Sequence, residues 1–108
     1  MKVKDIMTTN VQCANQSATL EEVSNQMKSL NVGSIPICDS GNRLLGIVTD
    51  RDIVVRGLSQ GLQSQAMAKD VMTVSPVTVS PDTDVTEATR LMSEHQIRRI
   101  PVVENGIL

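Results

Sequence analysis

Residues 46–55 read Gly-Ile-Val-Thr-Asp-Arg-Asp-Ile-Val-Val, an apolar run that passes through a threonine into a charged, helix-like segment. The apolar run is typical of a buried strand. Thr49, followed three residues later by Asp52, predicts a helix N-terminus where a hydroxyl and a carboxylate face free backbone N–H groups. Those N–H groups and the helix dipole favour an anion, and the carboxylate can accept hydrogen bonds from a ribose diol. The junction is a candidate site for a phosphorylated ligand, the alternative being that both residues only cap the helix.

The composition narrows the class of protein. A chain of 108 residues suffices for one compact domain or two small half-domains. Because it has no Phe, Tyr or Trp, its core is aliphatic, and a nucleobase would have to lie between aliphatic side chains, Met sulfur or an Arg plane. The net charge of −2 and the scattered Lys and Arg argue against a nucleic-acid partner. No run is long enough to span a membrane and no signal segment is present, so we expect no membrane partner and a cytoplasmic protein.

Few residues support metal or catalytic chemistry. Cys13 and Cys38 stand alone, and we expect them to be reduced, largely buried thiols. His95 has no Cys or His close by in sequence, which argues against a metal site and favours a surface or helix-end histidine. Asp50 and Asp52 lie close together at an expected helix start, but no nucleophile–base pair accompanies them. We therefore expect a protein that is not an enzyme and requires no cofactor.

The chain is an internal duplication. The opening Val-Lys-Asp-Ile-Met-Thr at residues 3–8 recurs as Ala-Lys-Asp-Val-Met-Thr at residues 68–73, an offset of 65 residues. A match that continues at one offset without a gap is the signature of a repeat. The same offset joins further identical residues, namely Glu22 with Glu87, Met27 with Met92, Ile35 and Pro36 with Ile100 and Pro101, and Gly41 with Gly106.

The duplication sets the expected domain boundaries. The first repeat covers residues 1–57, and the segment 58–66, rich in Gly, Ser and Gln, is the linker. The second repeat covers residues 67–108 and stops at the start of its second strand. It has no counterpart of residues 46–55, so its C-terminal strand and helix are missing.

Within each repeat, the pattern predicts a helix followed by short strands. The first helix of each repeat begins at a capping pair, Thr19 with Glu22 and Asp84 with Glu87. Asn31 is an expected helix end. Apolar residues at helical spacing give each helix one buried face: Leu20, Val23, Met27 and Leu30 in the first, and Val85, Ala88, Leu91 and Met92 in the second. The remaining expected elements are strands over 34–38 and 43–48, a turn over 39–42 and a helix over about 50–56.

Three features follow one another along the chain: the paired Asp-Ile/Val-Met-Thr openings, the paired Ile-Pro-Ile/Val segments and the stretch 46–53. In this combination they resemble a tandem pair of CBS domains, the motif named after cystathionine β-synthase. The resemblance covers nearly the whole chain. It implies an α/β (α+β) fold of two β-α-β-β-α repeats related by a pseudo-twofold axis, with small sheets packed against helices and a truncated second repeat. It also implies a non-catalytic regulatory module that binds an adenosine-containing ligand (AMP, ADP, ATP or S-adenosylmethionine) between the repeats, forms a homodimer and controls a partner protein.

Carried over to this chain, the family's ribose-binding Thr-x-x-Asp falls on Thr49 and Asp52. The resemblance places residues of the second repeat opposite this motif: Met72, Thr73, Val74, Arg98, Arg99, Ile100 and Pro101. Arg98 and Arg99 could neutralise phosphates through planar, forked contacts, or else form a solvated basic edge or a dimer contact.

The two clefts of the pair are not expected to be equivalent. Gly33 and Ser34 occupy the positions that match Arg98 and Arg99, and they carry no charge. We expect one competent nucleotide site, and a second cleft that is absent or suited to a nucleoside or S-adenosylmethionine. Two other functions are compatible with the resemblance: a structural dimerisation module whose clefts stay empty, and a regulatory fragment of an enzyme such as IMP dehydrogenase.

Overall fold

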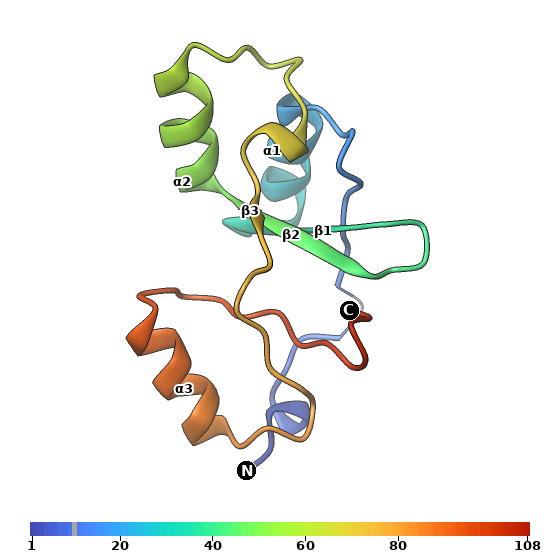
Figure 1. Ribbon diagram of the computed structural model, residues 1–108, viewed down its shortest axis with the longest axis vertical. Helices are drawn as coiled ribbons and strands as arrows, with labels where there is room; N and C mark the ends of the chain where they lie inside the picture. The colour runs from blue at the N-terminus through green and yellow to red at the C-terminus, as the bar shows by residue number, and fades with distance from the viewer. Residues whose placement is uncertain (10) are drawn as a thin grey trace.

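The structure, a computed structural model, describes residues 1–9 and 11–108, and in that range it contains three α-helices and one antiparallel sheet with strands in the order β1-β2-β3 (Figure 1). The bounds of the elements are α1, Leu20–Leu30; β1, Ser34–Cys38; β2, Leu44–Thr49; α2, Asp50–Asp52; β3, Thr73–Val74; and α3, Val85–Glu94. A π-helical turn, η2 (Ile53–Gly57), continues α2, and 3₁₀ turns include η1 (Val3–Asp5) and η4 (Ala68–Asp70). The expected α/β (α+β) composition is confirmed. None of these helices has the length and apolarity that crossing a membrane requires.

The hairpin of β1 and β2 supplies the main apolar core. Its turn follows Asp39, whose Oδ1 accepts hydrogen bonds from the N–H groups of Gly41 (2.9 Å) and Arg43 (3.0 Å). The strand register pairs Ile35 with Val48, and both side chains are buried. One face of the hairpin therefore packs with α1 in a single apolar cluster, which includes Leu20, Val23, Met27, Ile35, Ile37 and Val48.

The predicted cap of α1 forms, and the predicted cap of α3 does not. The Glu22 N–H donates to Oγ1 of Thr19 (3.1 Å) at the start of α1. Asp84 does occupy the N-cap position of α3, but its side chain accepts no capping hydrogen bond. The predicted capping pair of Asp84 with Glu87 is therefore wrong. An antiparallel bridge brings Lys2 alongside Asp84, and the Asp84 carboxylate lies 3.4 Å from the Lys2 ammonium instead.

The opening segment of each repeat packs against the other repeat. The Val3 N–H donates to the carbonyl oxygen of Thr83 (2.8 Å), and Val3 is buried with Ala88 of α3. In the same way, the Ala68 N–H donates to the carbonyl oxygen of Ala18 (2.7 Å), and Ala68 is buried in the cluster around α1. Figure 1 shows the N-terminal turn close to α3 and the turn at the start of the second repeat close to α1. The two repeats are thus interlocked by their openings.

The first strand expected in the second repeat is not formed. Residues 100–103 make only an isolated bridge, whereas β1 pairs with β2 along its whole length. No such partner strand for residues 100–103 exists in the described part of the chain. The chain then makes a tight turn at Asn105 and Gly106, which have φ values of 54° and 80°, and Ile107 pairs with Arg43 of the first repeat.

Equivalent positions of the two repeats differ sharply in burial. Ile6 and Val71 are related by the offset of 65 residues, yet Val71 is 1% exposed and Ile6 is 63% exposed. Gly57 of η2 packs against Val71. The described part of the second repeat has no counterpart of η2 to cover Ile6. Ile6 therefore stays exposed, whereas its equivalent Val71 is covered.

The two cysteines, expected to stand alone, are neighbours. Cys13 lies on the segment before α1 and Cys38 at the end of β1, and a parallel bridge between Ala14 and Ile37 joins these segments. Both cysteines are free, but only Cys38 is buried as expected, whereas Cys13 is half-buried. Sequence spacing could not reveal this proximity, because it arises from the pairing of two distant segments.

Candidate functional site

The junction of β2 and α2 is a closed capping box, which confirms the predicted helix start. Oγ1 of Thr49 accepts a hydrogen bond from the Asp52 N–H (3.0 Å), and Oδ2 of Asp52 accepts one from the Thr49 N–H (3.0 Å). The Asp52 side chain is 12% exposed, and its Oδ1 lies 3.8 Å from Nε of Arg56. Each carboxylate oxygen has a second lone pair, so the group can still accept a hydrogen bond from a ligand while it caps α2.

The start of the second repeat lies along the strand that leads to this junction. Thr73 and Val74 form β3 and pair with β2. Gly46 of β2 has no room for a side chain, since a Cβ there would lie 2.6 Å from the Thr73 carbonyl oxygen and 3.0 Å from Sδ of Met72. This close approach of two backbones gathers Met72, Thr73 and Val74 beside the strand that ends at Thr49.

A cavity of about 1150 Å³ opens between the two repeats. Of the predicted site residues, 98–101 line this cavity, and the group around the end of β2 does not. The walls are largely aliphatic and come from both repeats. Lining residues that bear on ligand binding are Met7, Thr8, Thr9 and Ser34 of the first repeat and Arg98, Arg99, Ile100 and Pro101 of the second.

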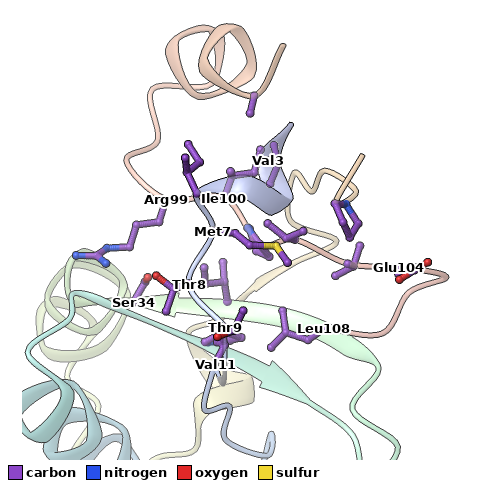
Figure 2. A pocket seen from close by; sticks show the side chains of 18 of the residues that line it. Val3, Met7, Thr8, Thr9, Val11, Ser34, Arg99, Ile100, Glu104 and Leu108 are labelled. Atoms are coloured by element: carbon purple, nitrogen blue, oxygen red, sulfur yellow. The ribbon is translucent and has the colours of Figure 1, made fainter. Parts of the chain in front are cut away.

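The basic end of the cavity is formed by the two predicted arginines. Figure 2 shows the Arg99 side chain extending toward the side of the cavity where Thr8 and Ser34 lie, with Glu104 at the opposite end. Neither Arg98 nor Arg99 forms an ion pair with an acidic residue in the described part of the chain. Their exposed guanidinium groups are therefore available to an anion, which they can bind through paired hydrogen bonds.

Strand β1 connects the two groups of predicted residues. Ser34 lines the cavity, and it is paired with Thr49 in the β1–β2 register. Sequence reasoning did not nominate Thr8 or Thr9, and it considered Ser34 only as an uncharged residue of the other cleft. Thr8 is the equivalent of Thr73 at the offset of 65 residues, so applying the repeat in both directions would have found it.

The cavity is lined by cationic, hydroxyl, amide and aliphatic groups, and the carboxylate of Glu104 lies at the end opposite Arg99. Among residues 1–9 and 11–108, no three His, Cys, Asp or Glu side chains gather into an arrangement that could hold a metal ion. His95 is exposed and forms the C-cap of α3, as expected for a helix-end histidine. The groups that are present suit an anionic organic ligand with an apolar part.

Comparison with known sequences matches this architecture to one family. The CBS domain profile covers residues 3–58 and 68–108. Protein YlbB of Bacillus subtilis (strain 168) is 44% identical over 105 residues, which span 96% of this chain and 71% of YlbB.

Solved structures give the same result. Hypoxic response protein I, whose crystal structure contains two coordinated zinc ions, aligns with a TM-score of 0.91 and 35% identity over 100% of this chain and 88% of that one. PAE2072 from Pyrobaculum aerophilum, in complex with AMP, aligns with a TM-score of 0.90 and 26% identity over 100% and 83%. The CBS pair of MJ0100, in complex with 5′-methylthioadenosine and S-adenosylmethionine, aligns with a TM-score of 0.88 and 27% identity over 98% and 82%. The resemblance inferred from the motifs is confirmed, and the chain belongs to the CBS domain family.

Proposed function

We propose that this chain is a non-catalytic regulatory module that binds an adenosine-containing ligand, with AMP as the first candidate, in the cavity between its repeats. The observation that carries the proposal is a cavity lined by both repeats, with aliphatic walls and a basic end whose arginines form no ion pair with the described residues. Its volume of about 1150 Å³ lies slightly above the range of about 300–1,000 Å³ typical of small-ligand pockets, so a nucleotide has room. The AMP and S-adenosylmethionine complexes of similar CBS pairs support this choice of ligand.

Each part of the ligand has a matching group. Arg98 and Arg99 would neutralise the phosphate, with the hydroxyl of Thr8 as a further donor. The adenine would lie against Ile100 and Pro101, because no aromatic ring is available for stacking. The ribose would reach the Thr49–Asp52 junction, which adjoins the cavity through the pairing of Ser34 with Thr49.

The mechanism follows from the interlocked repeats. A ligand that contacts both repeats favours the relative arrangement that fits it best, and a partner protein can respond to that shift in population. The functional unit is then the pair, with the first repeat over residues 1–57, the linker over 58–66 and the second repeat over 67–108. We include a homodimer in the proposal, as membership of the CBS domain family implies.

The proposal is tested by calorimetric titration of the chain with AMP, ADP, ATP, S-adenosylmethionine, 5′-methylthioadenosine and adenosine. We expect saturable binding of at least one phosphorylated ligand. The variant Arg99→Gln should weaken AMP binding by roughly 10- to 100-fold, the range for losing hydrogen bonds to a charged group. The control Arg90→Gln removes the same charge from the exposed face of α3, outside the cavity, and should leave affinity unchanged. No binding of any of these ligands would instead favour a structural dimerisation module.

A further inference from the structure

Cys13 and Cys38 are brought together by backbone pairing rather than by chance contact. The Ala14 N–H donates to the carbonyl oxygen of Pro36 (3.0 Å), and the Cys38 N–H donates to the carbonyl oxygen of Ala14 (2.9 Å). These two hydrogen bonds form a parallel bridge that pairs Ala14 with Ile37. Side chains alternate along extended chains, so the residues next to this pair, Cys13 and Cys38, project on the same side of the bridge.

The two thiols differ in accessibility and reactivity. Cys38 is 2% exposed, and burial, followed by the nearby Cys13 thiol, raises the pKa of Cys38 to about 12. Cys38 is therefore a protonated, protected thiol at neutral pH. Cys13 is half-buried, and its Sγ donates to Oδ1 of Asn42 (3.6 Å). An external oxidant can reach Cys13 first, with Cys38 behind it.

We propose that Cys13 and Cys38 form a reversible intramolecular disulfide when the chain meets a small disulfide oxidant such as oxidised glutathione. The Cys13 sulfur attacks one glutathione sulfur, and a protein–glutathione mixed disulfide forms as one reduced glutathione leaves. The Cys38 sulfur then attacks Cys13, and the second glutathione leaves with the Cys38 proton. Overall, two protein thiols become one disulfide, and one oxidised glutathione becomes two reduced ones.

The disulfide would change the cavity because it ties together two parts of its wall. Val11 and Gln12, which precede Cys13, line the cavity, as does Asn42, the partner of the Cys13 thiol. On the other side, Ser34–Pro36 of β1 line it just before Cys38. A covalent link between these segments fixes this wall, while reduction leaves the backbone bridge and the weak hydrogen bond from Cys13 to Asn42. The pair is thus a modification site through which redox state acts on the cavity.

The test is a peptide map of the chain incubated with oxidised glutathione, alkylated and digested with trypsin without reduction. Trypsin cleaves after Lys4, Lys28 and Arg43, so Cys13 and Cys38 fall on separate peptides, residues 5–28 and 29–43. We expect these two peptides to appear as one linked species that dithiothreitol separates. The thermal midpoint should rise by roughly 10 °C on oxidation, as for a disulfide that closes a loop of this length. The variant Cys13→Ser should show no linked species, an alkylated Cys38 and no oxidation-dependent shift in midpoint.

Three outcomes would overturn the proposal. The first is a Cys13 that stops at the glutathione mixed disulfide, or stays unmodified, while the protein is folded. The second is linkage between chains, which a mixture of ¹⁵N-labelled and unlabelled protein would reveal as hybrid linked peptides. The third is zinc held by the two thiols, detected as metal that a chelator releases and that blocks the reaction with oxidised glutathione.

Discussion

At the scale of single residues, Asp52 combines a folding role with the proposed binding role, and two substitutions separate them. Asp52→Ala removes the acceptor for the Thr49 N–H and should lower the free energy of unfolding by about 1 kcal/mol. Asp52→Asn keeps an acceptor oxygen but loses the charge, so it should retain most of the stability. Both should weaken AMP binding by roughly 10- to 100-fold. Urea denaturation and calorimetric titration measure the two effects.

The control for Asp52 is Asp82→Ala, which removes an exposed carboxylate whose one ion pair among the described residues is with Lys4 at the surface. Such pairs contribute about 0–1 kcal/mol, so stability and affinity should change little. If Asp52→Asn bound AMP as tightly as the wild type, Asp52 would be a helix cap alone.

Cys38 makes a separate contribution at alkaline pH. Burial and the neighbouring Cys13 thiol raise its pKa from 9.0 to about 12 in the folded chain. Between these values the unfolded chain has released the thiol proton while the folded chain still holds it, so unfolding is increasingly favoured as pH rises. The stabilisation is complete below pH 9 and falls from there toward pH 12. Urea denaturation under reducing conditions should therefore show the wild type losing its advantage over Cys38→Ala across this interval. A constant difference between the two proteins would contradict the assignment.

Individual residues of the candidate site differ in how well the sequence predicts their contacts. The Thr49–Asp52 box was predictable because both partners lie within three residues and the capping rule is local. The approach of Arg99 to Thr8 and Ser34 was not, because it depends on how distant segments pack. Arg98 and Arg99 do line the cavity, but their role in binding a phosphate stays a prediction, and the hydroxyl groups opposite them were not predicted.

At the scale of elements, the N-termini of α1 and α3 allow the contribution of a helix cap to stability to be measured, because one has a side-chain cap and the other does not. Thr19 accepts a hydrogen bond from the backbone of α1, whereas Asp84 accepts none from α3 and pairs with Lys2 instead. Thr19→Ala should therefore lower the free energy of unfolding by about 1 kcal/mol. Asp84→Ala should cost less than half of that, because it breaks only an exposed ion pair. Urea denaturation of both variants checks this, and equal losses would mean that Asp84 caps α3 in solution.

The boundaries of helices and strands agree with prediction where the residues that determine them are close in sequence. Asn31 ends α1 in the left-handed conformation with φ of 56°, as its residue type predicts. Strand β1 occupies its predicted range because β2 pairs with it along its length. Residues 100–103 carry the same apolar pattern but lack such a partner in the described chain, so pattern alone did not make a strand. A segment with an apolar pattern therefore forms a strand only when a second strand is present to pair with it.

At the scale of the whole molecule, the exchange of opening segments was the feature least accessible to sequence. The two openings are nearly identical, so each could in principle pack on its own repeat or on the other. The duplication predicted two units and their internal order, but not which opening completes which core. The structure assigns Val3 to the core with α3 and Val71 to the core with α1.

Because each opening packs against the other repeat, a substitution in one opening should destabilise the helix of the other repeat. Val3→Ala removes buried methyl groups next to Ala88 and should loosen α3, although Val3 belongs by sequence to the first repeat. Val71→Ala should loosen α1 in the same manner. Each substitution should lower the free energy of unfolding by about 1–3 kcal/mol, the range for small cavities in a core.

Hydrogen exchange resolved by peptide locates the effect: amides of α3 should exchange faster in Val3→Ala, and amides of α1 in Val71→Ala. Faster exchange in α1 alone for Val3→Ala would show that each opening packs on its own repeat in solution. Ligand binding would then connect two independent units instead of reinforcing an interlocked pair.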